Sequence, residues 1–96
     1  MMTTVSAHEK FIRRCIELAD QAARGGDEPF AAMLTVDGEV ALTAQNCVIR
    51  DRDRTQHAEL ILVSQALRKF DADMLRRATI YASTEPCIMC AAAIYW

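Results

Sequence analysis

Apolar residues recur with a helical period near the N-terminus of the chain. Four of them share one face of a helix: Phe11, Cys15, Leu18 and Ala22. Ser6 and Glu9 have the spacing of a capping box, in which each side chain accepts from a backbone N–H at the helix start. Gly25 and Gly26 end the pattern, because glycine adopts the left-handed conformation that terminates helices. The sequence therefore predicts a first helix between Ser6 and Gly25.

Two shorter apolar runs follow, and a turn signal separates them. Phe30–Val36 and Glu39–Ala44 have the composition of strands. Asp37-Gly38 between them supplies the positive φ angles of a type I′ turn. The pattern predicts a β-hairpin.

The middle of the chain combines a charge run with a second helical segment. The signs of the charges alternate from Arg50 to Arg54, and we interpret this run as a solvated loop rather than a patch that recruits substrate. Thr55 can cap a helix that continues to about Phe70. We expect three apolar residues of this helix to share one face: Leu60, Val63 and Leu67.

The last third of the chain returns to a strand and a helix. A polar connection over Asp71–Arg77 leads to a strand over Ala78–Ser83, and Pro86 suits the first turn of a third helix. The elements then run helix, strand, strand, helix, strand, helix in one domain over residues 1–96. A strand–helix–strand unit favours a mixed sheet covered by helices, which is an α/β fold.

Composition and charge narrow the class of protein. Of the 96 residues 52% are hydrophobic and 25% are charged, as in a folded globular domain. No apolar run reaches the roughly 18 residues of a membrane span, and no secretory signal is recognisable. The formal net charge of −2 argues against nucleic-acid binding through bulk charge. We therefore expect a cytoplasmic protein, in which paired cysteines bind metal or do chemistry rather than form disulfides.

Two short motifs carry the candidate chemistry. His57-Ala58-Glu59 opens the second helix, and Cys87 and Cys90 stand at the start of the third, where the helix dipole favours thiolates. Two thiolates and one imidazole supply three of the four tetrahedral positions of Zn²⁺, and the fourth is left for water. Glu59 could then take a proton from that water and pass it to a leaving group.

Other readings of these residues remain open. A structural zinc module would need a fourth protein ligand, taken from His8, Cys15 or Cys47. A thiol redox protein would use Cys87 and Cys90 alone. An inactive fragment could hold the motifs without activity. Otherwise we expect Cys15 in the core and His8 at the surface, and we assign no role to Cys47.

The two motifs together resemble a known family. His57-Ala58-Glu59 with Thr84–Cys90 is similar to the cytidine/deoxycytidylate deaminase-like superfamily, in its branch of guanine deaminases and tRNA-specific adenosine deaminases. Pro29-Phe30 and Ile94-Tyr95-Trp96 are more similar to guanine deaminase. The resemblance implies a three-layer α-β-α fold with a mixed sheet, of which this chain would lack the C-terminal portion. We expect such a chain, made alone, to self-associate.

The resemblance also implies roles for single residues. His57, Cys87 and Cys90 would be the zinc ligands, and Glu59 would be the catalytic proton shuttle. The substrate would be bound by Asn46 through its side chain, by Phe30 through packing on the base, and by Ala58 through its backbone N–H.

Three positions depart from the family's usual residues, all outside the ligand set. Ala31 and Ala92 replace glycines, and Arg54 replaces a proline. These departures could reshape the pocket entrance or a close approach of the backbone.

The implied activity is hydrolytic deamination of a nucleobase or nucleoside, with zinc as cofactor. Guanine is the preferred substrate, and tRNA adenosine or cytosine/cytidine are the alternatives. The pI of about 5.6 fits tRNA less well than a small molecule. The partner that the same resemblance implies is a second copy in a homodimer, and we expect no membrane to be involved.

Overall fold

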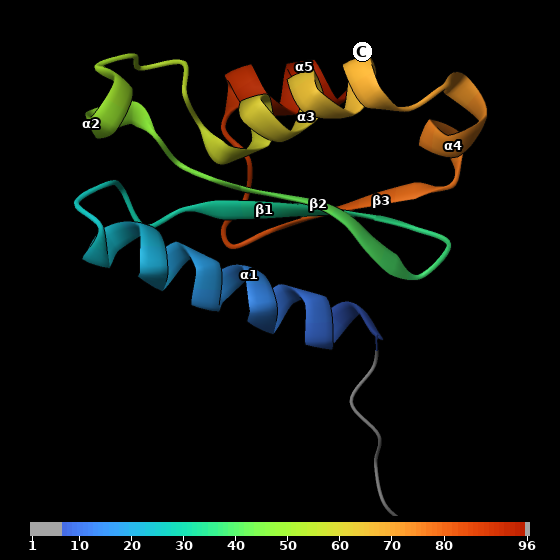
Figure 1. The fold of residues 1–96 in the computed structure, drawn as a ribbon, viewed down its shortest axis with the longest axis horizontal. Coiled ribbons are helices and arrows are strands. Elements are labelled where there is room, and N and C mark those ends of the chain that lie inside the picture. Colours follow the sequence, from blue (N-terminus) through green and yellow to red (C-terminus); the bar gives the residue numbers. More distant parts are fainter. Residues whose placement is uncertain (1–6, 96) are drawn as a thin grey trace, which may run out of the picture.

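The computed structural model describes residues 7–95, which form three layers (Figure 1). A three-stranded sheet lies in the middle; α1 covers one face, and α3 with α5 beside it covers the other. The elements follow one another along the chain as α1 (Ala7–Arg24), β1 (Ala31–Val36), β2 (Glu39–Gln45), α2 (Val48–Asp51), α3 (Ala58–Lys69), α4 (Ala72–Arg76), β3 (Ala78–Ala82) and α5 (Ile88–Tyr95). The predicted α-β-α layering is confirmed, whereas Ser6 and Trp96 lie outside the described residues.

The sheet has the strand order β2-β1-β3. Leu34 at the middle of β1 pairs with Leu42 on one side and Ile80 on the other, and both pairings are antiparallel. The mixed sheet that we expected is therefore absent from the described residues. The crossover through α3 does make β2 and β3 run in the same direction, but β1 lies between them and separates the parallel pair.

The predicted hairpin is confirmed. Asp37 and Gly38 have φ angles of 52° and 82°, as a type I′ turn requires, and they connect the paired residues Val36 and Glu39. The register shifts between Leu34 and Thr35, which marks a β-bulge in the ladder.

The central strand β1 is apolar except for Thr35, because both of its faces are buried. Met33 packs with Cys15 of α1 and Tyr81 of β3 on one face of the sheet. Ala32 and Leu34 point to the opposite face, where they pack against Leu62 and its neighbours on α3. The predicted core position of Cys15 is thus confirmed.

Helix α3 presents a different face to the sheet from the one that we expected. Its buried apolar residues are Ala58, Leu62 and Ala66, whereas Leu67 is 60% exposed. The sequence contains two overlapping apolar stripes, and only packing on β1 and β2 selects between them.

Two connecting segments also differ from their predictions. Residues 46–55 contain the short helix α2, and Thr55 bonds to Asp53 instead of capping α3. Residues 71–77 contain α4, which Asp71 caps by accepting from the backbone N–H of Met74. Both short helices are held by side-chain hydrogen bonds that apolar periodicity does not reveal. In the part of the chain that is described, no helix is long and apolar enough to cross a membrane.

Candidate metal centre and substrate cavity

The N-terminal ends of α3 and α5 carry the predicted metal ligands. His57 is the N-cap of α3, and its carbonyl accepts from the backbone N–H of Ile61. The carbonyl of Cys87 accepts from the N–H of Ala91, so α5 begins after Cys87 and not at Pro86. Because α3 and α5 pack against each other, their first turns lie together.

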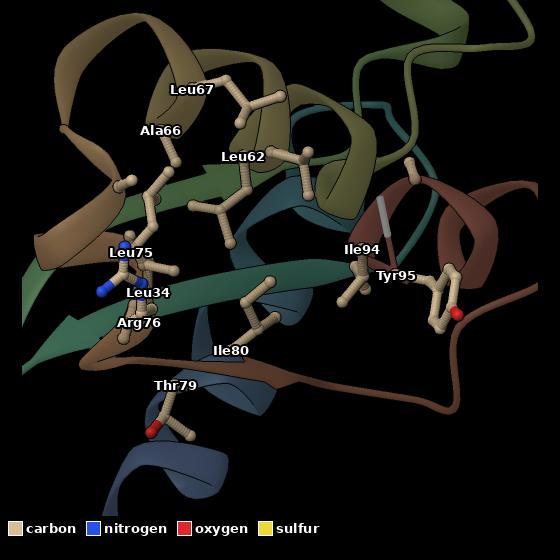
Figure 2. A pocket seen from close by; sticks show the side chains of 14 residues that line it. Leu34, Leu62, Ala66, Leu67, Leu75, Arg76, Thr79, Ile80, Ile94 and Tyr95 are labelled. Carbon is tan, nitrogen blue, oxygen red and sulfur yellow. The ribbon is translucent and has the colours of Figure 1, made fainter.

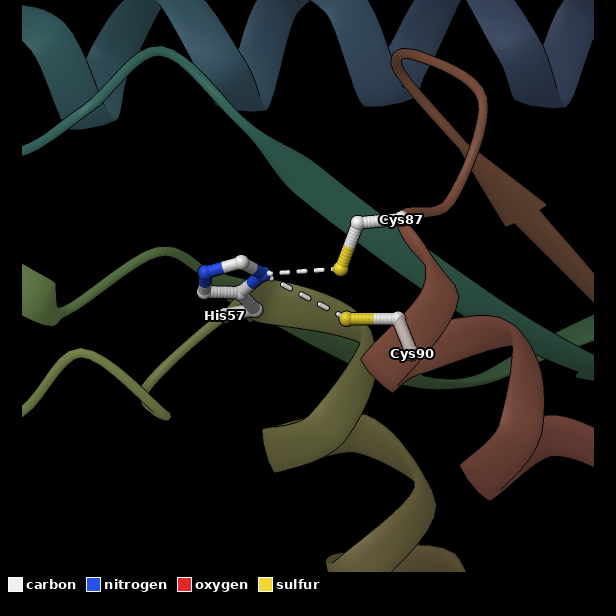
Figure 3. Close-up of side chains that lie close together, drawn as sticks. All are labelled: His57, Cys87 and Cys90. Carbon is white, nitrogen blue, oxygen red and sulfur yellow. Dashed lines mark hydrogen bonds between the residues drawn. The ribbon is translucent and has the colours of Figure 1, made fainter.

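The three side chains converge on one point (Figure 3). His57 Nδ1 lies 3.6 Å from Cys87 Sγ and 3.4 Å from Cys90 Sγ. All three ligand atoms lie within 4.8 Å of one another. With Zn–S of about 2.3 Å and Zn–N of about 2.0–2.1 Å, a nitrogen and a sulfur on a tetrahedral ion lie about 3.6 Å apart. The arrangement therefore fits zinc, and it supplies three ligands.

The environments of the two thiols differ. The backbone N–H of Cys90 lowers the pKa of the exposed Cys87 thiol, because it stabilises the thiolate. Burial raises the pKa of the Cys90 thiol to about 12, and the Cys87 side chain and the Glu59 charge add to this effect. A bound divalent cation stabilises both thiolates, so metal binding at this site is coupled to loss of protons.

A cavity of about 210 Å³ opens beside these ligands. Eight residues line it: Glu28, Phe30, Asn46, His57, Glu59, Thr84, Glu85 and Cys87. Glu59 is only 7% exposed, which places a carboxylate in a largely desolvated position in the same cavity as two of the metal ligands. The volume is smaller than the roughly 300–1,000 Å³ of pockets for drug-sized ligands, so it suits a single heterocyclic ring system.

Asn46 lies in this cavity with a fixed orientation. Its side chain is 1% exposed, and Oδ1 accepts from the backbone N–H of Val48 at 3.0 Å. The amide nitrogen is thereby turned toward Glu28, whose Oε1 lies 3.4 Å from Nδ2. Asn46 thus presents a hydrogen-bond donor at the cavity wall.

The other two predicted substrate contacts differ in their surroundings. Phe30 lines the cavity and is partly exposed, so its ring is available for packing on a ligand. Ala58 is fully buried at the first position of α3, and its methyl group belongs to the core. Its backbone N–H is among those of the first turn, which have no partner within the helix.

Three residues of the cavity wall received no role from the sequence: Glu28, and the motif residues Thr84 and Glu85. Glu28 directly precedes Pro29-Phe30, and Thr84-Glu85 directly precedes Pro86-Cys87, so adjacency to the motifs was the available signal.

An ion pair behind the cavity was also missed. The buried carboxylate of Asp27 accepts from the backbone N–H of Arg50 at 2.9 Å and from its guanidinium at 3.1 Å. The alternating charge run therefore contains a structural contact as well as solvated residues.

The remaining candidate ligands are used elsewhere. The ring of His8 bonds to the hydroxyl of Tyr81, Cys15 Sγ donates to the Tyr81 carbonyl, and Cys47 Sγ donates to the Gln45 carbonyl. His8 is exposed, as expected. Among residues 7–95, His57, Cys87 and Cys90 form the cluster suited to a metal, and none of these other three joins it. This geometry does not favour a closed structural zinc site.

A larger groove of about 740 Å³ is lined mainly by residues of α3, α4, β3 and α5 (Figure 2). Leucine and isoleucine side chains dominate its wall, including Leu62, Leu67, Ile80 and Ile94. It lacks the converging titratable groups of the smaller cavity, so we place the candidate chemistry in the smaller one.

Comparison with known proteins agrees with this geometry. Residues 5–96 match the family described as the cytidine and deoxycytidylate deaminase zinc-binding region. The chain belongs to this family. The predicted resemblance is therefore confirmed, and zinc is the metal that the family description names.

Relatives within the deaminase family act on different bases. Guanine deaminase of Bacillus subtilis is 38% identical over 90 residues, which are 93% of this chain and 58% of that protein. The tRNA-specific adenosine deaminase of Aquifex aeolicus is 33% identical and matches 90% of this chain and 57% of its own length. A probable cytosine deaminase of Schizosaccharomyces pombe is 34% identical and matches 99% of this chain and 59% of its own length.

The fold is shared with a solved deaminase structure. The X-ray structure of guanine deaminase from B. subtilis superimposes with a TM-score of 0.81 at 35% identity, covering 93% of this chain and 57% of that one. This deaminase family member thus spans somewhat more than half the length of the relatives that it matches.

Proposed function

We propose that this chain carries the catalytic centre of a zinc-dependent hydrolytic deaminase that acts on a nucleobase or nucleoside. The observation that carries the proposal is the position of a buried carboxylate, Glu59, in the same cavity as His57 and Cys87 of the three-ligand cluster. A dithiol redox centre would require neither the imidazole next to the sulfurs nor the carboxylate in the same cavity.

In this proposal the zinc ligands are His57, Cys87 and Cys90. When bound, zinc acts as a Lewis acid that lowers the pKa of water and so supplies a nucleophile near neutral pH. Glu59 accepts a proton from the attacking water and donates it to the amino group, which leaves as ammonia. The low exposure of Glu59 limits competition from solvent for this proton.

Phe30 and Asn46 are proposed to hold the base. The ring of Phe30 offers an apolar surface at the cavity wall, and Nδ2 of Asn46 offers a donor for an oxygen or nitrogen of the base. The backbone N–H of Ala58, at the start of α3, supplies a second donor.

Guanine is the proposed substrate. The 38% identity to the guanine deaminase of B. subtilis supports it, as does the small volume of the cavity. The relatives named for tRNA adenosine make a tRNA-specific adenosine deaminase the alternative. The single domain, the homodimer and the cytoplasmic location stay predictions.

Ammonia release tests the proposed function directly. Zinc-loaded protein is incubated with guanine, cytosine, adenine, the corresponding nucleosides and tRNA, and ammonia is measured against a Glu59→Gln variant. We expect release from guanine that depends on both zinc and Glu59. Release from a pyrimidine alone would contradict the substrate proposal, and no release from any member of the panel would contradict the activity.

A further inference from the structure

The loop before β1 holds the Glu28 backbone in a defined position at the cavity wall. The backbone N–H of Asp27 donates to the Ala22 carbonyl, and the Asp27 carboxylate is tied to Arg50. On the other side, the N–H of Phe30 donates to the Glu28 carbonyl at 2.9 Å, which closes a three-residue turn around Pro29. The backbone of Glu28 is therefore held by bonds of the residues that precede and follow it.

The same loop is joined to the end of β2. The backbone N–H of Asn46 donates to the Phe30 carbonyl at 3.0 Å, and the Asn46 side chain donates to Glu28 at 3.4 Å. Glu28 and Asn46 thus stand next to each other at the cavity wall, one as an acceptor and one as a donor. Their mutual bond uses one oxygen and one hydrogen, and a carboxylate and an amide each have further capacity.

A donor next to an acceptor on the protein pairs with an acceptor next to a donor on the ligand. A ring carbonyl beside a ring N–H, called a lactam edge, would accept from Asn46 Nδ2 and donate to Glu28. Guanine has such an edge at its carbonyl and N1–H, whereas adenine and 2-aminopurine do not. Glu85 also lines the cavity, but it is exposed and so less suited to hold a base in register.

We infer that Glu28 is a substrate-binding residue that, together with Asn46, selects amino-substituted bases that carry a lactam edge. The inference rests on the proposed deaminase function and specifies its substrate class. It adds a determinant that lies outside the zinc-binding motifs. A hydrogen bond to a charged acceptor contributes enough to change affinity by about 10- to 100-fold.

A matched pair of bases and three variants test this inference. Guanine and 2-aminopurine carry the same amino group at the same ring position, but only guanine has the lactam edge. Ammonia release from both is measured with zinc-loaded wild type, Glu28→Met, Glu28→Gln and Glu39→Met. Glu39 is exposed at the hairpin, so Glu39→Met controls for the loss of a carboxylate elsewhere.

The expected result is a preference for guanine that depends on Glu28. We expect Glu28→Met to lower the kcat/KM ratio of guanine to 2-aminopurine by about 10- to 100-fold, mainly through the KM for guanine. Glu28→Gln keeps an acceptor oxygen and should lose less, while Glu39→Met should match wild type. Unchanged zinc content and thermal midpoint show that each variant is folded.

Two other outcomes are distinguishable. If wild type deaminates guanine and Glu28→Met keeps the same base preference, the role of Glu28 is wrong and the deaminase function stands. If folded, zinc-loaded wild type releases ammonia from none of the bases, the proposed function fails, and the inference fails with it.

Discussion

Nδ1 of His57 lies 3.4 Å from Sγ of Cys90, although the two residues are 33 positions apart in the chain. The proximity arises because His57 caps α3, Cys90 lies in the first turn of α5, and the two helices pack together on one face of the sheet. The metal cluster is thus held by two helix starts, which are rigid elements.

Removal of a ligand should remove the metal. We expect one zinc per chain in the wild type and loss of most of it in His57→Ala or Cys90→Ser, because two remaining ligands leave the coordination incomplete. The zinc content per chain of each protein is measured by elemental mass spectrometry. Cys47→Ser is the matched control, since Cys47 lies outside the cluster. Equal zinc loss in the control would contradict the assignment.

Glu59→Gln should separate metal binding from catalysis. Glu59 lines the cavity and is not in the ligand cluster, so the variant should keep its zinc. Ammonia release should fall by about 10²- to 10⁴-fold, the usual contribution of a general acid–base group. Full turnover in a zinc-loaded Glu59→Gln protein would contradict the proton-transfer role of Glu59.

Loss of Asp27 should lower the free energy of unfolding more than loss of its partner Arg50. Asp27→Ala leaves the backbone N–H of Arg50 without its partner and should lower the free energy of unfolding by about 1–3 kcal/mol. Arg50→Ala keeps that N–H and loses an ion pair whose guanidinium side is 64% exposed, so it should cost less than about 1 kcal/mol. Urea unfolding followed by circular dichroism compares them, and the opposite order would contradict the structure.

The thiol of Cys15 should be inert in the folded protein. Burial raises its pKa to about 11, so only about one molecule in a thousand carries the thiolate at pH 8. Alkylation of the metal-free protein at pH 8 should therefore spare Cys15 and modify the exposed Cys87 first, followed by the partly exposed Cys47. The reactivity of Cys15 should rise as the pH approaches 11, where the thiolate forms, and on unfolding at any pH. Peptide mass mapping locates the label, and rapid labelling of Cys15 in folded protein at pH 8 would be the contrary result.

The sequence by itself determined the features that depend on residues close together in the chain. The helical period around Cys15 predicted α1, and Asp37-Gly38 predicted the hairpin turn, because φ preferences and side-chain periodicity act locally. The candidate ligands were also recognisable, because Cys87 and Cys90 occupy one helix start and His57 and Glu59 another.

Only the tertiary structure decided which distant groups meet. The antiparallel order of the sheet follows from the insertion of β1 between β2 and β3, and periodicity carries no information on strand neighbours. The buried face of α3 was likewise selected by packing, which buries Ala58, Leu62 and Ala66 instead of the leucine-rich stripe that apolar spacing indicates. Glu28 beside Asn46 depends on a loop and a strand end that are 18 positions apart, so no local pattern could reveal the pair. Local preferences thus specify the elements, and the chemistry of the cavity wall arises from contacts that form only when the layers pack.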